Sequence, residues 1–122
     1  MATILIVDDS NYTRRTHRRI LESDGHTVYE AATGMAAIES YFVHHPDLVL
    51  LDLTMEDIGG LEVLQKLREL NADARVIVVS ADVQRSTTRL VADSGAMRFV
   101  GKPVTPDALI ETVRAVLAEA AS

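Results

Sequence analysis

The chain has 122 residues, 48% of them hydrophobic and 25% charged, and its formal net charge is −6. This length and composition predict one globular domain over residues 1–122 with a sizeable buried core. The acidic balance argues against nucleic-acid binding and against an acidic membrane surface. The absence of cysteine excludes a disulfide, a thiolate metal site and a cysteine nucleophile. Because no signal peptide or apolar run of membrane length is recognisable, we expect a cytoplasmic protein.

Strand and helix patterns alternate along the chain. Continuous apolar runs such as TILIV, LVLL and VIVV are typical of strands buried on both faces of a parallel sheet, whereas TVYEA alternates and indicates an edge strand. We expect strands at residues 3–7, 27–31, 48–52, 76–80 and 97–100. We expect helices at about residues 11–24, 34–44, 61–70, 83–93 and 106–120. The alternation predicts an α/β fold, a five-stranded parallel sheet with five helices in the flavodoxin-like strand order 2-1-3-4-5.

Each helix should turn apolar side chains to the sheet and charged ones to solvent. In the first helix the inward side chains are predicted to be Tyr12, Thr16, Ile20 and Leu21. A solvated basic face, favoured over a phosphate-binding patch, should be formed by Arg14, Arg15, Arg18 and Arg19. In the second helix the apolar side should be formed by Ala37, Ile38, Tyr41 and Phe42. His17 and His26 are assigned to the surface, and His44-His45 is interpreted as a helix terminus instead of a metal site.

Polar side chains end four of the five predicted strands. Asp8 and Asp9 follow the first strand, Asp52 ends the third, Ser80 ends the fourth and Lys102 follows the fifth. In the expected strand order the first and third strands are neighbours, so the three carboxylates should converge in one crevice at the carboxyl ends of the strands. Three acids held together repel one another unless a cation joins them, and Mg²⁺ suits oxygen ligands. The charges of three acids, one dication and one lysine cancel.

Such a crevice suits a dianionic phosphoryl group. The metal and Lys102 can bind its oxygens and Ser80 can donate a hydrogen bond, while a carboxylate attacks phosphorus in line. Asp52 is the best candidate for this nucleophile because it stands alone on the central strand, whereas Asp8 and Asp9 are paired for metal binding.

The motifs ILIVDDS, PDLVLLDLTM, VIVVSAD and SGAMRFVGKPV stand in this order and at spacings that cover nearly the whole chain. With them, the chain resembles a bacterial two-component response-regulator receiver domain of the CheY-like type. The resemblance implies that Asp52 is the phosphoacceptor, that Lys102 binds the phosphoryl group and that the bond between Lys102 and Pro103 is cis. It also implies a Mg²⁺ site whose ligands are Asp8, Asp9, Asp52 and the backbone carbonyl of Thr54.

The resemblance further implies a signalling switch that catalyses its own phosphorylation and slow dephosphorylation. Ser80 is then the switch hydroxyl and Phe99 the switch aromatic. The phosphoryl group would come from a sensor histidine kinase or phosphotransfer protein, and a downstream protein would bind the fourth helix, fifth strand and fifth helix. Two residues depart from the family pattern, because Glu56 replaces a common proline and Phe99 replaces a common tyrosine. Arg98 and Arg89 would place like charges across a symmetric interface, so we expect a monomer.

Three other classes are compatible with parts of this pattern. A flavodoxin-type cofactor binder shares the fold, but Asp8-Asp9 would repel a phosphate at its phosphate loop, and no G-x-G-x-x-G or Walker motif is present. An aspartate-nucleophile phosphatase normally has a cap domain, for which 122 residues leave no room. A phosphorylation-independent protein-interaction module on the same fold is the remaining alternative, and the intact set of acids and lysine argues against it.

Overall fold

The computed structural model describes residues 1–53 and 58–121. Its strands are β1 (Thr3–Val7), β2 (Thr27–Ala31), β3 (Leu48–Asp52), β4 (Val76–Ser80) and β5 (Arg98–Gly101). Its helices are α1 (Asn11–Ser23), α2 (Gly34–His44), α3 (Gly60–Leu70), α4 (Arg85–Asp93) and α5 (Pro106–Ala121). No helix within the described ranges has both the length and the apolar character that crossing a membrane requires.

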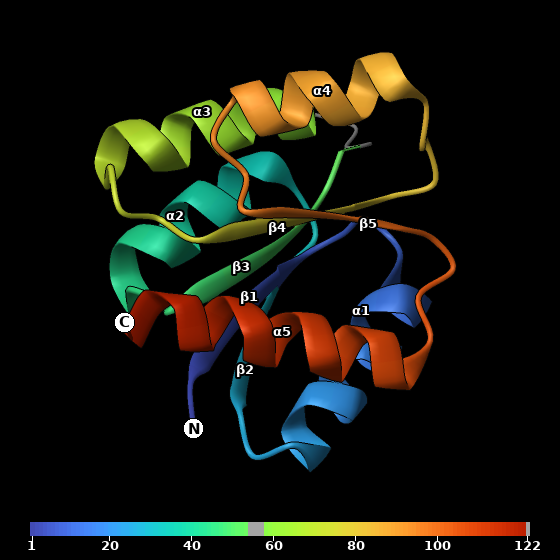
Figure 1. Cartoon of the computed structure of the whole chain (residues 1–122). Coiled ribbons are helices and arrows are strands. Elements are labelled where there is room, and N and C mark those ends of the chain that lie inside the picture. The colour runs from blue at the N-terminus through green and yellow to red at the C-terminus, as the bar shows by residue number, and fades with distance from the viewer. Residues whose placement is uncertain (54–57, 122) are drawn as a thin grey trace.

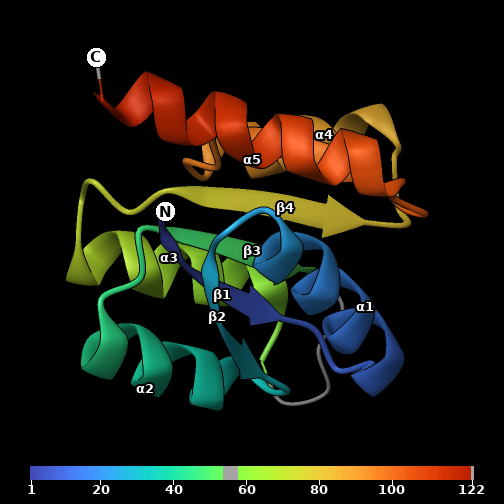
Figure 2. The same ribbon diagram turned by 90° about the horizontal axis from the view of Figure 1, so that it is seen from below.

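The strands form one parallel sheet in the order β2-β1-β3-β4-β5, as expected from the sequence (Figures 1 and 2). Val7 of β1 pairs with Leu51 of β3, so these two strands end side by side, and Asp52 follows Leu51 directly. Ser80 pairs with Gly101 at the end of β5, immediately before Lys102. The register therefore places the predicted site residues together at the carboxyl ends of the strands.

Helices cover both faces of the sheet (Figure 1). On one face, alternate strand residues such as Ile6 and Leu50 pack with Leu21 of α1 and Val113 of α5. On the other face, the intervening strand residues pack beneath α2, α3 and α4. Each fully buried Val, Leu or Ile side chain contributes about 1.5–3 kcal/mol through removal from water. The central strands are thus held rigidly, and the positions of their carboxyl ends are fixed by the core.

The inward face of α1 differs from the one predicted. Ser10 caps the helix as expected, because its hydroxyl accepts a hydrogen bond from the Thr13 N–H. The buried residues are His17 and Leu21, whereas Tyr12 is 80% exposed. The side chain of Arg14 is only 11% exposed. The surface assignments of His17 and Arg14 and the inward assignment of Tyr12 were therefore wrong, because the buried helix stripe passes through polar residues.

Two further burial predictions need correction. Phe42 of α2 is 67% exposed, because Ala37 and Tyr41 form the buried stripe of this helix. The side chain of His26 is only 7% exposed, and its Nδ1 accepts a hydrogen bond from the Ala2 N–H. The interpretation of the histidine pair as a helix end agrees with the structure, since α2 ends at His44 and is followed by a left-handed residue, His45.

Candidate functional site

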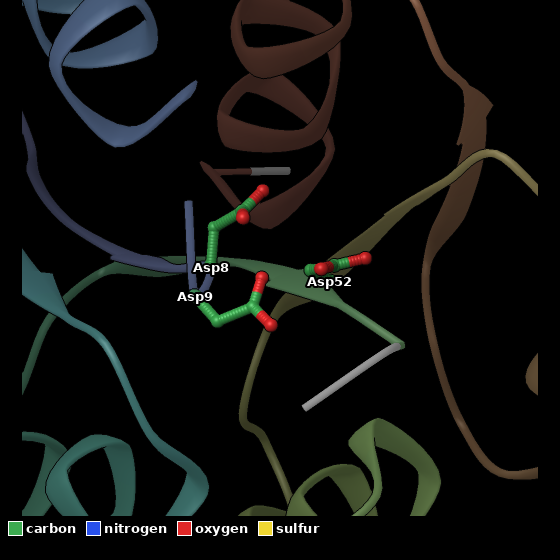
Figure 3. A group of neighbouring side chains, drawn as sticks. All are labelled: Asp8, Asp9 and Asp52. Carbon is green, nitrogen blue, oxygen red and sulfur yellow. The ribbon is translucent and has the colours of Figure 1, made fainter. Parts of the chain in front are cut away.

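Three carboxylates gather at the carboxyl ends of β1 and β3 (Figure 3). One oxygen from each of Asp8, Asp9 and Asp52 lies within 4.8 Å of the others. Asp8 is 3% exposed and Asp52 is 7% exposed, while Asp9 is open to solvent. The structure thus brings together the three acids that the sequence placed in one crevice.

A close backbone contact supports the end of β3. A Cβ atom added to Gly60 would lie 2.5 Å from the Leu53 Cα and 2.6 Å from the Asp52 carbonyl oxygen, which are rigid backbone atoms. The Gly60 N–H also donates to the Leu53 carbonyl at 2.9 Å. Only glycine allows α3 to begin against the strand end in this way, so Gly60 helps to set the position of Asp52.

Asp8 is held through its backbone and both carboxylate oxygens. Its N–H donates to the carbonyl of Ala31 at 3.2 Å and so extends the pairing of β1 with β2. The Ser10 N–H donates to Asp8 Oδ1 at 2.9 Å, and Lys102 Nζ donates to Oδ2 at 2.8 Å. The Arg14 guanidinium donates to the Asp8 carbonyl at 2.6 Å. This carboxylate is consequently fixed in orientation.

Lys102 reaches into the crevice from the chain after β5. Its N–H donates to the Ser80 carbonyl at 2.9 Å, which ties it to the end of β4, and its bond to Pro103 is cis, as the resemblance implied. Besides Asp8, its Nζ lies 3.6 Å from Asp52 Oδ1. Burial lowers the pKa of Lys102, but the hydrogen bond to Asp8 and the nearby Asp52 charge outweigh burial and raise the pKa above its ordinary value. The ammonium is therefore charged at neutral pH.

The donor set fits a hard divalent cation. Carboxylate oxygens are the ligands that Mg²⁺ prefers, and their mutual separation lets one ion contact several of them. Among residues 1–53 and 58–121, Lys102 is set against the three acids of this cluster, so a dication would complete the neutralisation of their charge. The backbone carbonyl of Thr54, which the resemblance implies as a further ligand, lies outside the described residues, as does Glu56.

Ser80 connects the crevice to the start of α4. It is 2% exposed, and its Oγ accepts a hydrogen bond from the Asp82 N–H at 3.1 Å. Asp82 in turn accepts from the Gln84 N–H at 3.1 Å and from the Thr87 hydroxyl at 2.8 Å. This turn explains why α4 begins at Arg85 and not at Val83, where the sequence pattern placed it. Phe99 of β5 is half-buried and packs against the core beneath α2, α3 and α4.

His17 also lies close to the crevice, although the sequence analysis gave it no role. With Tyr12, Thr16, Lys102 and Pro103 it lines a cavity of about 460 Å³ between α1 and the chain after β5. Burial lowers the pKa of His17; the Asp8 charge opposes this effect and the Lys102 charge reinforces it. The imidazole is thus neutral at neutral pH. A single histidine in a helix carries no motif that could have revealed this position.

Arg98 makes an ion pair that bears on the expected oligomeric state. Its guanidinium donates to a carboxylate oxygen of Glu119 on α5 of the same chain. The charge of Arg98 is therefore compensated within the molecule, and the like-charge repulsion assumed from the sequence is smaller than expected.

Comparison with known proteins places this geometry in context. The model of the response regulator receiver domain family matches residues 4–114. The chemotaxis protein CheY of Bacillus subtilis is 37% identical over 115 residues, which cover 93% of this chain and 96% of that protein. A crystal structure of a CheY-like response regulator receiver domain protein from Methanospirillum hungatei superposes with a TM-score of 0.93 at 29% identity, covering 98% of this chain and 95% of that one. CheY in the crystal structure of a CheX–CheY–BeF₃–Mg²⁺ complex from Borrelia burgdorferi gives a TM-score of 0.90 at 32% identity, covering 93% and 87% of the two chains.

Proposed function

Since the chain belongs to the response regulator receiver domain family, we propose that it accepts a phosphoryl group onto Asp52 in a Mg²⁺-dependent reaction. The donor is a histidine kinase, a phosphotransfer protein or a small phosphodonor. The observation that carries this proposal is the convergence of Asp8, Asp9 and Asp52 in one crevice, with Lys102 within reach of two of them. We take residues 1–122 as one receiver domain, and the cytoplasmic location stays a prediction.

The chemistry follows from the position of each group. An Asp52 carboxylate oxygen attacks phosphorus in line, forming a new O–P bond while the bond to the donor breaks and the leaving group departs with its electron pair. Mg²⁺, when bound by the acids, neutralises charge on the phosphoryl oxygens. Lys102 now shares its ammonium between Asp8 and Asp52, and it can exchange the contact with Asp8 for a phosphoryl oxygen. Slow hydrolysis of the aspartyl phosphate returns the domain to its resting state.

The signal is proposed to leave the crevice through Ser80. Turning toward the phosphoryl group, this hydroxyl would release the Asp82 N–H and loosen the turn that precedes α4. Phe99 could then turn inward, and this population shift would alter the face formed by α4, β5 and α5, where a downstream protein binds. Ser80 and Phe99 are supported in these roles by the burial of Ser80 and by the packing of Phe99 on the core beside α4.

Labelling with a small phosphodonor tests the proposal. Acetyl phosphate with Mg²⁺ should add one phosphoryl group to the wild-type chain, as seen in the intact mass, and chelation of the metal should prevent it. Asp52→Asn should abolish labelling, while Asp73→Asn, a change of an exposed acid at the opposite end of the sheet, should leave it unchanged. Labelling of Asp52→Asn at the wild-type level would refute the assignment. A phosphorylation-independent interaction module would instead show no labelling of any variant.

A further inference from the structure

Arg14 makes a set of contacts that a solvated helix residue would not make. From α1 its Nη1 donates to the carbonyl oxygen of Asp8 at 2.6 Å, and its Nε donates to Glu30 Oε1 on β2 at 3.1 Å. The remaining Nη2 donates to the Asn11 side chain. With its side chain only 11% exposed, the guanidinium lies between the strand end that carries Asp8 and the neighbouring strand.

The Asp8 carbonyl is a point where the chain needs such support. The pairing of β1 with β3 ends at Val7, and the chain then turns into α1. A carbonyl that leaves a sheet ladder needs another donor if it is to stay out of water. Arg14 supplies a charge-assisted hydrogen bond, which is shorter and stronger than a neutral one. Because this carbonyl belongs to the peptide group that joins Asp8 to Asp9, the hydrogen bond from Arg14 restrains that peptide group.

The anchor of this contact is Glu30. Its two carboxylate oxygens accept from Arg14 Nε at 3.1 Å and from Arg18 Nη1 at 2.8 Å. Hydrogen bonds from Arg18 and Arg14 hold the pKa of Glu30 below its ordinary value despite partial burial, so the carboxylate stays ionised. Because β2 is paired with β1 through the whole register from Thr3 to Val7, the anchor is rigid relative to the crevice.

We propose that Arg14 is a positioning residue that holds the Asp8–Asp9 peptide, through the Asp8 carbonyl and with Glu30 as its anchor, so that both carboxylates present oxygens to one divalent cation. The proposal rests on the Mg²⁺ site of the proposed function and extends it to a residue outside the ligand set. Arginine is required because its planar fork donates in two directions at once, to the carbonyl and to Glu30. Lysine, a point charge on a flexible stem, cannot hold both partners in fixed geometry.

The test is the Mg²⁺ dissociation constant of the protein without phosphodonor, measured by NMR titration of amide resonances. Groups that orient metal ligands typically contribute 10- to 100-fold to metal affinity, so Arg14→Lys and Arg14→Ala should weaken Mg²⁺ binding by about 10-fold. Arg19→Ala is the matched control, because it removes an exposed arginine from the same helix and leaves the hydrogen bonds of Asp8 and Glu30 intact. Its Mg²⁺ affinity should stay close to that of the wild type.

Thermal unfolding in the presence of a chelator separates positioning from a merely structural role. Arg14 variants that lose stability but keep the wild-type Mg²⁺ dissociation constant would overturn the proposal, and so would an equal loss of affinity in Arg19→Ala. Glu30→Gln should weaken Mg²⁺ binding as well, and its effect should not add to that of Arg14→Lys, because both changes act on one chain of contacts. If the wild-type protein itself binds no Mg²⁺, the proposed function fails at its metal site, a result distinct from failure of the Arg14 variants alone.

Discussion

Replacing Asp52 by asparagine should make the metal-free protein more stable, although the residue is proposed to be the phosphoacceptor. Among the described residues, the change removes one of three clustered acids, two of which lie close to the Lys102 ammonium. At an effective dielectric constant of about 20, the attraction between Asp52 and Lys102 at 3.6 Å is about 4–5 kcal/mol. Repulsion from Asp8 and Asp9, whose oxygens lie within 4.8 Å, is at least about 3 kcal/mol for each acid on the same scale.

Before screening, the repulsion therefore exceeds the attraction by at least about 2 kcal/mol, and water around the exposed Asp9 reduces this excess. We expect Asp52→Asn to raise the free energy of unfolding by about 1–2 kcal/mol in the presence of a chelator. A ligand at 100 times its dissociation constant stabilises a folded protein by about 2.7 kcal/mol, so Mg²⁺ at that level should stabilise the wild type by this amount and the variant by clearly less.

Urea unfolding followed by circular dichroism, with chelator and with Mg²⁺, measures both quantities. Asp73→Asn is the control for loss of a surface charge, and its effect should stay within about 0.5 kcal/mol. The reasoning is refuted if Asp52→Asn is less stable than the wild type in chelator, since the Lys102 contact would then outweigh the repulsion. It is also refuted if Mg²⁺ stabilises the variant and the wild type equally.

Three further predictions concern the switch, pH and assembly. Ser80→Ala should still be labelled by acetyl phosphate but should lose the phosphorylation-dependent NMR shifts of Phe99, because the hydroxyl that ties the crevice to Asp82 is gone; wild-type shifts would disprove the coupling. Since the pKa of His17 is lowered by burial, the unfolded state binds the extra proton, and stability is lost as pH falls through the ordinary value of 6.5 at up to about 1.4 kcal/mol per pH unit. In unfolding experiments between neutral and mildly acidic pH, His17→Gln should lose this part of the pH dependence, and an unchanged pH profile would contradict the assignment. Although Arg98 is paired with Glu119, the exposed Arg89 of α4 still places like charges across a symmetric interface, so the chain should remain a monomer by light scattering after size exclusion, with and without beryllofluoride as phosphoryl mimic; a dimer at micromolar concentration would refute this.

The strands and the crevice could be predicted because their sequence signals are strong. An unbroken run such as that from Leu48 to Leu51 has few explanations other than a strand covered on both faces, and the structure buries all four residues. Parallel strands have their carboxyl ends on the same side of the sheet. Because β1 and β3 are neighbours in the predicted strand order, the acids after β1 and at the end of β3 must lie close together. The convergence of the three acids follows from the strand order and needs no knowledge of side-chain packing.

The face of α1 could not be predicted in the same way. The helix offers few apolar residues, and the predicted inner face was Tyr12, Thr16, Ile20 and Leu21. Leu21 is buried and Ile20 packs against the core as predicted, but Tyr12 is exposed and the buried stripe includes His17. Hydrophobic periodicity assumes that buried positions are apolar. Here the stripe continues toward an acidic crevice, where Arg14 gains a carbonyl and a carboxylate as partners, and these partners come from chain segments that local sequence does not bring together.

Similar reasoning applies to the surroundings of Arg98 and to Phe42. The sequence showed Arg98 without a nearby acid on its own strand, but Glu119 lies 21 residues later in the chain and pairs with it from α5. Phe42 fell within the apolar side of α2 by composition, yet the helix turns Tyr41 to the core and leaves Phe42 mostly exposed. Long-range ion pairs and the exact rotation of a short helix are properties of packing, which the local pattern leaves open.

The measurement that tests the central claim most directly is a crystal structure of the protein with Mg²⁺ and beryllofluoride. We predict a beryllofluoride group bonded to a carboxylate oxygen of Asp52, one Mg²⁺ ion bound by Asp8 and Asp9, and Lys102 Nζ moved from Asp8 to a fluorine atom. Beryllofluoride bonded to another acid, or an Asp52 complex in which Lys102 keeps its hydrogen bond to Asp8, would contradict the proposed phosphoryl site.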